Sequence, residues 1–177
     1  MHLRTIDMKH FDREVQLIRE IYNQSWEHNW GFVPLSEAEF EFVAKDLRQI
    51  VDPEIVLIAE IDGRPIGFAM ALPDINQALI HLKGRLFPTG LIKLLWHTKI
   101  RNKIDGVRVA TLGVIPDYRK RGIDSLMYYR IHKRAGELGY KWGEFSGILE
   151  TNELMVNASK QIGGELYKRY RIVEMPI

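Results

Sequence analysis

The chain has 177 residues, of which 46% are hydrophobic, and it contains 25 Lys and Arg, 23 Asp and Glu, and no cysteine. That length suits one domain with a sizeable core, and the composition excludes a wholly disordered chain. The lack of cysteine excludes a disulfide scaffold, a cysteine nucleophile and a thiolate metal site. A net charge of +2 argues against a strongly electrostatic DNA-binding protein, so no DNA partner is expected.

Nothing in the sequence predicts insertion into a membrane or secretion. No apolar run reaches the roughly 18 residues of a membrane span, and the N-terminal residues lack the apolar core of a signal peptide. The absence of cysteine also fits a reducing compartment. These features together predict a cytoplasmic protein.

The first half of the chain predicts two helices followed by a hairpin. Apolar residues recur at helical spacing over residues 11–22, and again over 40–50 after a Ser/Glu capping box. The aromatic-rich segment 25–34 joins these two helices. Two apolar runs, 55–61 and 66–72, flank an Asp-Gly turn, which predicts a β-hairpin.

The second half predicts a basic helical segment and then alternating strands and helices. Residues 74–83 and 89–99 have helical patterns, so a helical insert is expected at 74–104. The remaining predicted elements are, in chain order, a strand at 107–115, a helix at 123–138, a strand at 140–149, a helix at 152–162 and a last strand at 165–174. This order predicts an α/β fold with a mixed sheet and helices packed on it.

The most informative segment, residues 112–123, combines the end of a strand, a proline stop, a basic loop with a glycine, and the start of a helix. Such a loop directs backbone N–H groups and the positive end of the helix dipole at one point, which predicts an anion site. Arg119, Lys120 and Arg121 add positive charge around it. The alternative is an ordinary strand–helix connection whose basic residues are solvated.

This segment resembles the loop of the GNAT superfamily of acetyl-CoA-dependent N-acetyltransferases. The family's loop reads Arg/Gln-x-x-Gly-x-Gly/Ala, and Arg119 and Gly122 occupy its first two fixed positions. The preceding residues Leu112-x-Val114-x-Pro116 also match the family. The resemblance is therefore carried by a strand and a loop in the expected order.

A second block of the chain also matches, because Asn152 and Gly163 stand at a spacing that the family often shows. The resemblance implies a single GNAT-like domain over residues 1–177, with a mixed, mostly antiparallel twisted sheet flanked by helices. It implies acetyl-CoA as co-substrate and no metal. Residues 79–88 resemble an uncharacterised branch whose members are often longer, which is compatible with this chain being the C-terminal part of a larger protein.

The resemblance also implies which residues hold the cofactor. The strand backbone would contact the pantetheine arm and polarise the thioester carbonyl, and the loop amides would hold the pyrophosphate. The cofactor-binding residues implied in this way are Leu112, Gly113, Val114, Arg119, Lys120, Arg121, Gly122, Ile123, Asp124 and Asn152.

The chain departs from the family pattern at three positions. Asp124 replaces the last Gly/Ala of the loop and brings a carboxylate near the pyrophosphate, although an Asp in a first helical turn also complements the helix dipole. Ser159 stands where the family often carries a Tyr that protonates the leaving thiolate, and Gly147 where some members carry a Glu general base. These departures leave open a non-catalytic CoA-binding or sensor domain.

Direct acetyl transfer to an amine needs a base for the acceptor and a donor for the carbonyl oxyanion. Glu144 and Glu150 lie on one alternating face of the strand predicted after the main helix, and both are candidate bases. The alternatives are an exposed strand face for Glu144 and a place beside a helix start for Glu150. Asn152 is itself a good helix N-cap. The six histidines are scattered, so no zinc site is indicated.

The near-neutral total charge divides into two unlike regions. Residues 75–104 hold six Lys or Arg and no acid, which leaves 19 basic against 23 acidic residues elsewhere, a net of −4. A basic cover over the substrate side predicts either an acidic or phosphate-bearing amine, which is a small molecule or a peptide, or a contribution to binding the phosphates of CoA. The alternatives are a solvated basic helix and an RNA- or membrane-surface-binding module. A homodimer is compatible with the sequence.

Overall fold

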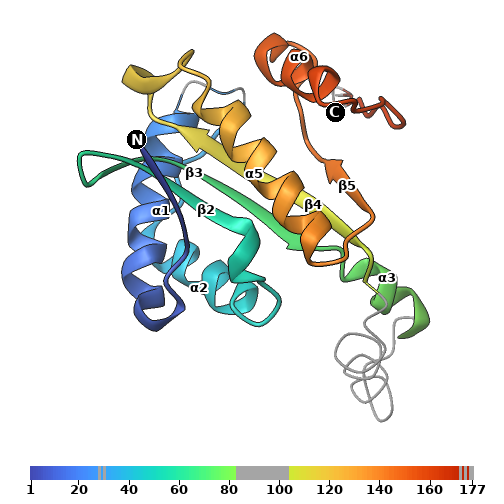
Figure 1. The fold of residues 1–177 in the computed structure, drawn as a ribbon, viewed down its shortest axis with the longest axis horizontal. Helices are drawn as coiled ribbons and strands as arrows, with labels where there is room; N and C mark the ends of the chain where they lie inside the picture. Colours follow the sequence, from blue (N-terminus) through green and yellow to red (C-terminus); the bar gives the residue numbers. More distant parts are fainter. Residues whose placement is uncertain (28, 30, 83–103, 172, 174, 176–177) are drawn as a thin grey trace. The chain divides into compact units, whose positions relative to one another are not determined.

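The computed structural model describes residues 1–177 apart from 28, 30, 83–103, 172, 174 and 176–177 (Figure 1). It divides into two compact units, residues 1–146 and residues 147–177. The larger unit contains β1 (His2–Thr5), α1 (Phe11–Trp26), α2 (Glu37–Leu47), β2 (Val56–Ile61), β3 (Arg64–Pro73), α3 (Asn76–Leu79), β4 (Gly106–Val114), α5 (Ile123–Glu137) and β5 (Trp142–Phe145). The smaller unit contains α6 (Glu153–Gln161).

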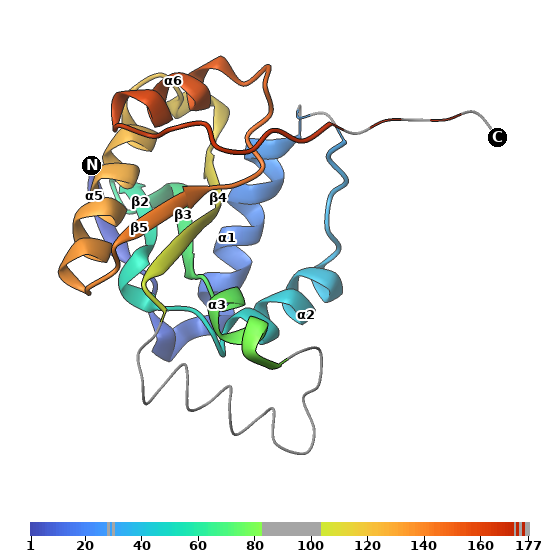
Figure 2. The same ribbon diagram turned by 90° about the vertical axis from the view of Figure 1, so that its right-hand side faces the viewer.

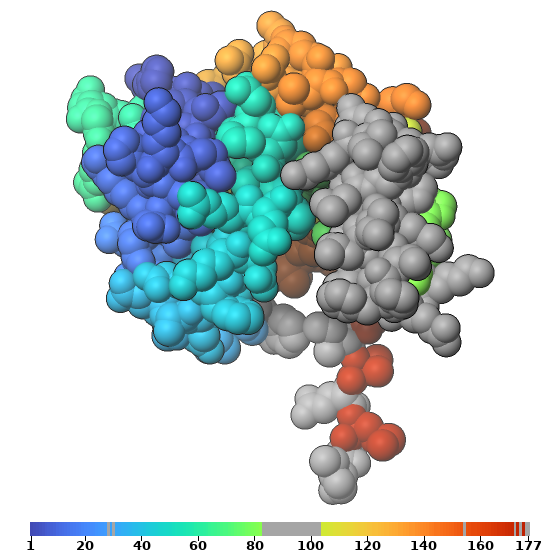
Figure 3. Space-filling view, turned by 90° about the horizontal axis from the view of Figure 1, so that it is seen from below, coloured from blue at the N-terminus to red at the C-terminus, as the bar shows by residue number. Residues whose placement is uncertain are grey.

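Five strands form one sheet in the order β1-β2-β3-β4-β5. The first three pairings are antiparallel, and the β4–β5 pairing is parallel. α5 lies on one side of the strands and α1 on the other (Figure 2). α2 packs against α1, and the two helices lie side by side in the view from below (Figure 3). The predicted fold class, a mixed and mostly antiparallel sheet flanked by helices, is therefore confirmed.

Apolar side chains from the sheet and from α5 form the centre of the core. The largest fully buried side chains are Phe68, Ile55, Leu57, Ile58, Ile66, Met127 and Val56. α1 buries Phe11, Val15 and Ile18, the residues that its helical spacing predicted, and it continues to Trp26. α2 begins at the predicted capping box. The period of the apolar residues therefore located these helices correctly.

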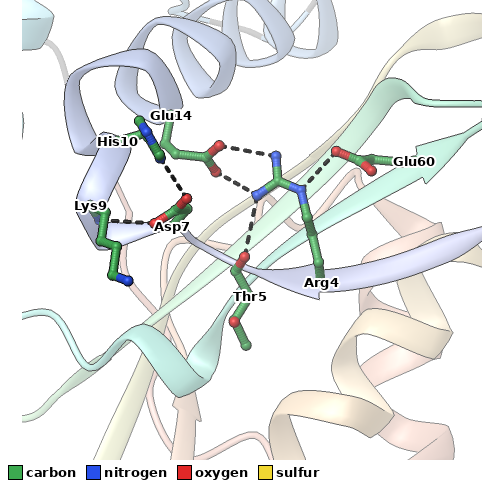
Figure 4. A network of polar contacts seen from close by, with 7 residues as sticks. All are labelled: Arg4, Thr5, Asp7, Lys9, His10, Glu14 and Glu60. Carbon is green, nitrogen blue, oxygen red and sulfur yellow. Dashed lines mark hydrogen bonds and ion pairs between the residues drawn. The ribbon is translucent and has the colours of Figure 1, made fainter.

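β1, which the sequence did not predict, is joined to its neighbours by an ionic network (Figure 4). The Arg4 guanidinium donates to both carboxylate oxygens of Glu14 on α1, at 2.7 and 3.0 Å, and to Glu60 on β2, at 2.7 Å. Glu14 is only 4% exposed, so its buried charge depends on Arg4 for a partner. The network holds the N-terminal strand against both the first helix and the sheet.

β4 carries an irregularity close to its middle. Met70 of β3 pairs with Thr111, but the next residue, Ala71, pairs with Val109, so Ala110 is an extra residue in β4. Such a bulge bends the strand and increases its twist. β5 pairs only with the part of β4 that precedes the bulge. Within the described part of residues 1–146, the outer edge of β4 is therefore open beyond Ala110.

Two predicted elements are shorter in the structure. The helix predicted at 74–83 is limited to α3 and a 3-10 helix at 80–82, and the helix predicted at 89–99 lies outside the described residues. β5 has four residues, fewer than the strand predicted at 140–149. Most of the basic insert expected at 74–104 consequently lies outside the described residues, and its helical character stays a prediction.

The strand predicted at 165–174 is wrong for the residues described there, which belong to no strand. Leu166 and Tyr170 are 75% and 81% exposed. An alternating apolar pattern forms a stable strand only when a neighbouring strand takes up its backbone groups, and these side chains lack a packed face. Among the described residues, no helix is long and apolar enough to cross a membrane.

Candidate functional site

The chain leaves the sheet at the end of β4 through a short connection to α5. Ile115 still donates its N–H to Ile66 of β3, at 3.0 Å, and Pro116, which has no N–H, then begins a 3-10 helix. Lys120 and Gly122 have positive φ values of 59° and 74°, the left-handed conformation that glycine adopts without strain. These two residues turn the chain so that α5 starts shortly after the strand ends.

Four consecutive backbone N–H groups at the start of α5 have no acceptor among the described protein groups. They belong to residues 122–125, and no side chain caps the start of α5. The first turn of a helix leaves such donors unsatisfied, and the helix dipole adds a partial positive charge there. Lys120 and Arg121 are exposed beside them. The turn therefore has the features of the helix N-termini that bind phosphate groups in other proteins, and its binding of an anion stays a prediction.

Asp124, the departure from the family loop, lies in the first turn of α5. Burial, and then the charge of the Asp124 carboxylate, raise the pKa of Tyr128 well above its ordinary value. Residues four apart are neighbours on a helix, so the two side chains lie on one side of α5. Because Tyr128 is only 3% exposed, that side is the one that faces the core.

The open edge of β4 presents Leu112 and Val114. Ile115 is hydrogen-bonded to β3, and alternate residues of an antiparallel strand direct their backbone groups to opposite sides, so Leu112 and Val114 direct theirs outward. Their carbonyls already accept side-chain donors: the Trp26 indole N–H at 3.3 Å and the Arg119 Nε–H at 3.1 Å, respectively. The outward N–H groups of Leu112 and Val114 have no acceptor among the described residues, so their geometry would allow them to donate to a ligand's carbonyl oxygen.

The end of α1 is clamped to this edge. Arg119 also donates from Nη2 to the Ser25 carbonyl at 2.5 Å, so its guanidinium joins α1, β4 and the anion turn. Gly113 lies so close to α1 that a Cβ there would be 2.2 Å from the Ser25 Oγ. The Trp26 ring stacks on Tyr22, with 5.4 Å between ring centroids. The family motif predicted the loop at Arg119 but not this use of its side chain, and the aromatic-rich segment was the only sequence signal for Trp26.

Glu144, a predicted base, lies on β5 directly beside Arg108 of β4. Its carboxylate oxygen Oε2 accepts from both Nε and Nη2 of Arg108, at 3.0 and 2.7 Å, and its side chain is 13% exposed. The adjacent residue Phe145 packs edge-on against Tyr128 of α5, so Glu144 points to the opposite face of the sheet, where α1 lies.

The other predicted residues belong to the smaller unit. Asn152 caps α6, because its Oδ1 accepts the Met155 N–H at 3.3 Å. Glu150 is exposed, and its carboxylate lies 3.8 Å from Arg169 Nη1. A catalytic role of Glu150 and a pantetheine contact of Asn152 remain predictions. In the described residues, no three His, Asp or Glu side chains lie together in a way that could hold a metal ion.

Two curated proteins are similar to most of this chain. It is 39% identical over 97% of its length to the bacterial ceramide synthase of Caulobacter vibrioides, and 40% identical over 99% to YghO of Escherichia coli. The match covers 46% of each relative, so the chain spans about half the length of the curated relatives it matches.

Solved structures with the same fold include AAC(6')-Iy, an aminoglycoside N-acetyltransferase, in complex with a CoA bisubstrate analogue. The TM-score is 0.61 at 16% identity, over 99% of this chain and 98% of that one. A ribosomal-protein-alanine N-acetyltransferase from Brucella melitensis gives 0.59 at 15% identity, over 92% and 83%. Identities this low establish the fold alone. The model of the acetyltransferase (GNAT) family matches residues 15–152, and the chain therefore belongs to that family.

Proposed function

We propose that the protein transfers an acyl group from acyl-CoA to an amine, with the CoA held along β4 and in the turn before α5. The observation that carries this proposal is the succession of two outward N–H groups, at Leu112 and Val114, and four unsatisfied N–H groups at 122–125. The turn suits the pyrophosphate, and the edge of β4 suits carbonyl oxygens of the pantetheine arm and the thioester.

The reaction is a direct displacement. The neutral amine nitrogen attacks the thioester carbon, the C–N bond forms, and the C–S bond breaks to release the CoA thiolate, while the amine proton passes to a base. An N–H of the β4 edge stabilises the oxygen that becomes negative. Glu144 is the proposed base, directly or through water, because it faces the α1 side of the sheet from the strand next to the open edge. Glu150 is the second candidate.

The family resemblance implies an acetyl group as the acyl group that is transferred. The relative named bacterial ceramide synthase supports a longer group, because a ceramide is the amide of a fatty acid and a long-chain amino alcohol. We therefore place a fatty acyl-CoA ahead of acetyl-CoA as the donor. The departures at Asp124, Ser159 and Gly147 favour the second candidate function, a CoA-binding domain without turnover.

Release of free thiol from acetyl-CoA and from palmitoyl-CoA, in the presence of a panel of amines, tests the proposal. Arg119→Gln should weaken CoA binding about fivefold, because the shorter Gln side chain can keep at most one of the two hydrogen bonds that Arg119 donates to Val114 and Ser25. Arg13→Gln, at an exposed arginine of α1, should change nothing. Glu144→Gln should lower kcat while the CoA affinity stays. Binding of CoA without thiol release by the wild type supports the non-catalytic domain, and absence of CoA binding refutes both functions.

A further inference from the structure

The smaller unit exposes a group of large apolar side chains that follow one another closely in the sequence. They are Leu166, Tyr167, Tyr170, Val173 and Met175, and they are between 62% and 87% exposed. The described residues of this stretch belong to no helix or strand. Single exposed apolar residues are ordinary, but a contiguous group of them usually marks a surface that binds a partner. Residues 165–171, 173 and 175 are named the tyrosine segment.

The tyrosine segment is also positively charged. Residues 165–171 contain three exposed cations, Lys168, Arg169 and Arg171, and a single acid. The Lys168 ammonium lies over the Tyr167 ring, 4.9 Å from its centre, and Arg169 Nη1 lies 3.8 Å from a carboxylate oxygen of Glu150, which is itself exposed. A contact of that length between two exposed groups is weak, so the Arg169 charge stays accessible to a partner.

The order of these side chains argues against an apolar protein surface as the partner. If the segment were extended, Lys168 would point to one side, between two apolar residues, and Arg169 and Arg171 would point to the other. Either side would therefore bring a cation into an interface with another strand or a protein core. Lys and Arg are almost never fully buried unless they are paired, so the partner must accept apolar and cationic side chains together.

The surface of an anionic lipid bilayer accepts both kinds of side chain. Tyrosine is enriched at membrane–water interfaces, because its ring is apolar and its hydroxyl group is polar. Lysine and arginine keep their charged ends among the headgroups while their stems lie along apolar surface. Each such cation strengthens binding to an anionic surface about fivefold. Leu166, Val173 and Met175 would supply apolar groups that enter the boundary with the acyl chains.

We propose that the tyrosine segment binds the surface of an anionic lipid bilayer. The apolar side chains and the cations contact the same surface, the first at the acyl boundary and the second at the headgroups. The inference goes beyond the proposed function and does not depend on it, because binding to lipid vesicles needs neither CoA nor an amine. It also differs from a membrane contact through basic residues 75–104, since it assigns the contact to the smaller unit.

The first test measures co-sedimentation with vesicles of phosphatidylcholine, with and without phosphatidylglycerol. The wild type should bind the anionic vesicles more tightly than the neutral ones, and added salt should weaken this binding. Replacing two cations, Lys168→Gln with Arg171→Gln, should weaken binding to the anionic vesicles about 25-fold. The matched control, Lys9→Gln with Arg64→Gln, removes two exposed cations of the larger unit and should leave the affinity unchanged.

The second test locates the contact on the chain. Because the protein has no cysteine, one introduced thiol can be labelled alone with the fluorophore NBD, whose emission rises in apolar surroundings. Val173→Cys and Val33→Cys each replace an exposed valine, the first in the tyrosine segment and the second in the larger unit. Anionic vesicles should raise the emission at position 173 and not at position 33. All these variants should unfold at the wild-type temperature, because exposed side chains contribute little to stability.

Several results would overturn the inference. They are failure of the wild type to bind anionic vesicles, wild-type affinity in the Lys168→Gln, Arg171→Gln variant, and equal emission changes at positions 173 and 33. If this double variant binds vesicles like the wild type but loses self-association in analytical ultracentrifugation, the partner is a second copy of the chain. If it loses binding to single-stranded RNA instead, the partner is a nucleic acid, and the inference fails in both cases.

Discussion

Replacing Gly113 with alanine tests whether the end of α1 is clamped to β4. The added Cβ would lie 2.2 Å from Ser25 Oγ and 3.1 Å from both Ser25 Cβ and Phe68 Cε1. Either the Ser25 hydroxyl must rotate away and lose its hydrogen bond to the Tyr22 carbonyl, or the helix end must move. Overpacking of this kind costs about 1 to 3 kcal/mol. For a protein of this size each kcal/mol lowers Tm by roughly 2 to 4 °C. The movement also strains the bond from Arg119 to the Ser25 carbonyl, so CoA affinity should fall about fivefold.

Two further variants identify the contact that is responsible. Ser25→Gly removes both Ser25 atoms that the new Cβ meets, so Gly113→Ala should cost much less in that background, and a double-mutant cycle measures the difference. Gly136→Ala is the matched control, because a Cβ at that position of α5 meets nothing within 4 Å. It should raise stability by about 0.5 to 1 kcal/mol, as expected for alanine in a helix interior. Thermal unfolding and calorimetry with CoA give both readouts.

The proposed clamp between α1 and β4 is refuted if the Gly113→Ala variant unfolds at the same temperature as the wild type and binds CoA as tightly. It is refuted equally if the variant is destabilised to the same extent with and without Ser25→Gly. In the first case the end of α1 moves without consequence, and in the second the cost arises from Phe68 or from the strand backbone.

Two other variants test the ionic network around Arg4 and the decrease in folding stability at alkaline pH. Arg4→Met leaves the Glu14 carboxylate, whose side chain is 6% exposed, buried without its cation, and should cost about 3 to 5 kcal/mol in urea unfolding. Adding Glu14→Leu should recover most of that loss. Burial, and then Asp52, raise the pKa of Tyr140 to about 12, so its neutral form contributes stability that is lost as the pH rises from 10 towards 12. Tyr140→Phe should therefore flatten the stability profile over that range.

The parts of the site that could be predicted are those encoded by neighbouring residues. Pro116, the basic residues after it and Gly122 follow one another in the sequence, and together they specify a strand end, a turn and a helix start. The apolar spacing of α1 and the capping box of α2 are equally local signals. Each depends on contacts within about one or two helical turns, which a periodic pattern records directly.

The parts that escaped prediction depend on residues far apart in the sequence. β1 is short and is held by Arg4, whose partner Glu60 is 56 residues away. Trp26 and the Leu112 carbonyl are separated by 86 residues, and Arg119 and Ser25 by 94. The final strand predicted at 165–174 fails for the opposite reason, since its local pattern suits a strand but the described residues have no neighbouring strand.

The bulge at Ala110 determines which side chains of β4 reach each helical layer. In the part of β4 before the bulge, the Val109 side chain lies on the α5 side of the sheet, as does its neighbour Phe145. In the part after the bulge, Val114 lies on the α5 side near Met127, and Thr111 and Gly113 face α1. In a regular strand the side-chain period of two would bring odd-numbered residues to one face throughout. Deleting Ala110 should therefore reverse one end of β4, either burying Thr111 against α5 or exposing Val109. We expect a large loss of stability and of CoA binding. A deletion variant that unfolds at the same temperature as the wild type and binds CoA as tightly would contradict this account of the bulge.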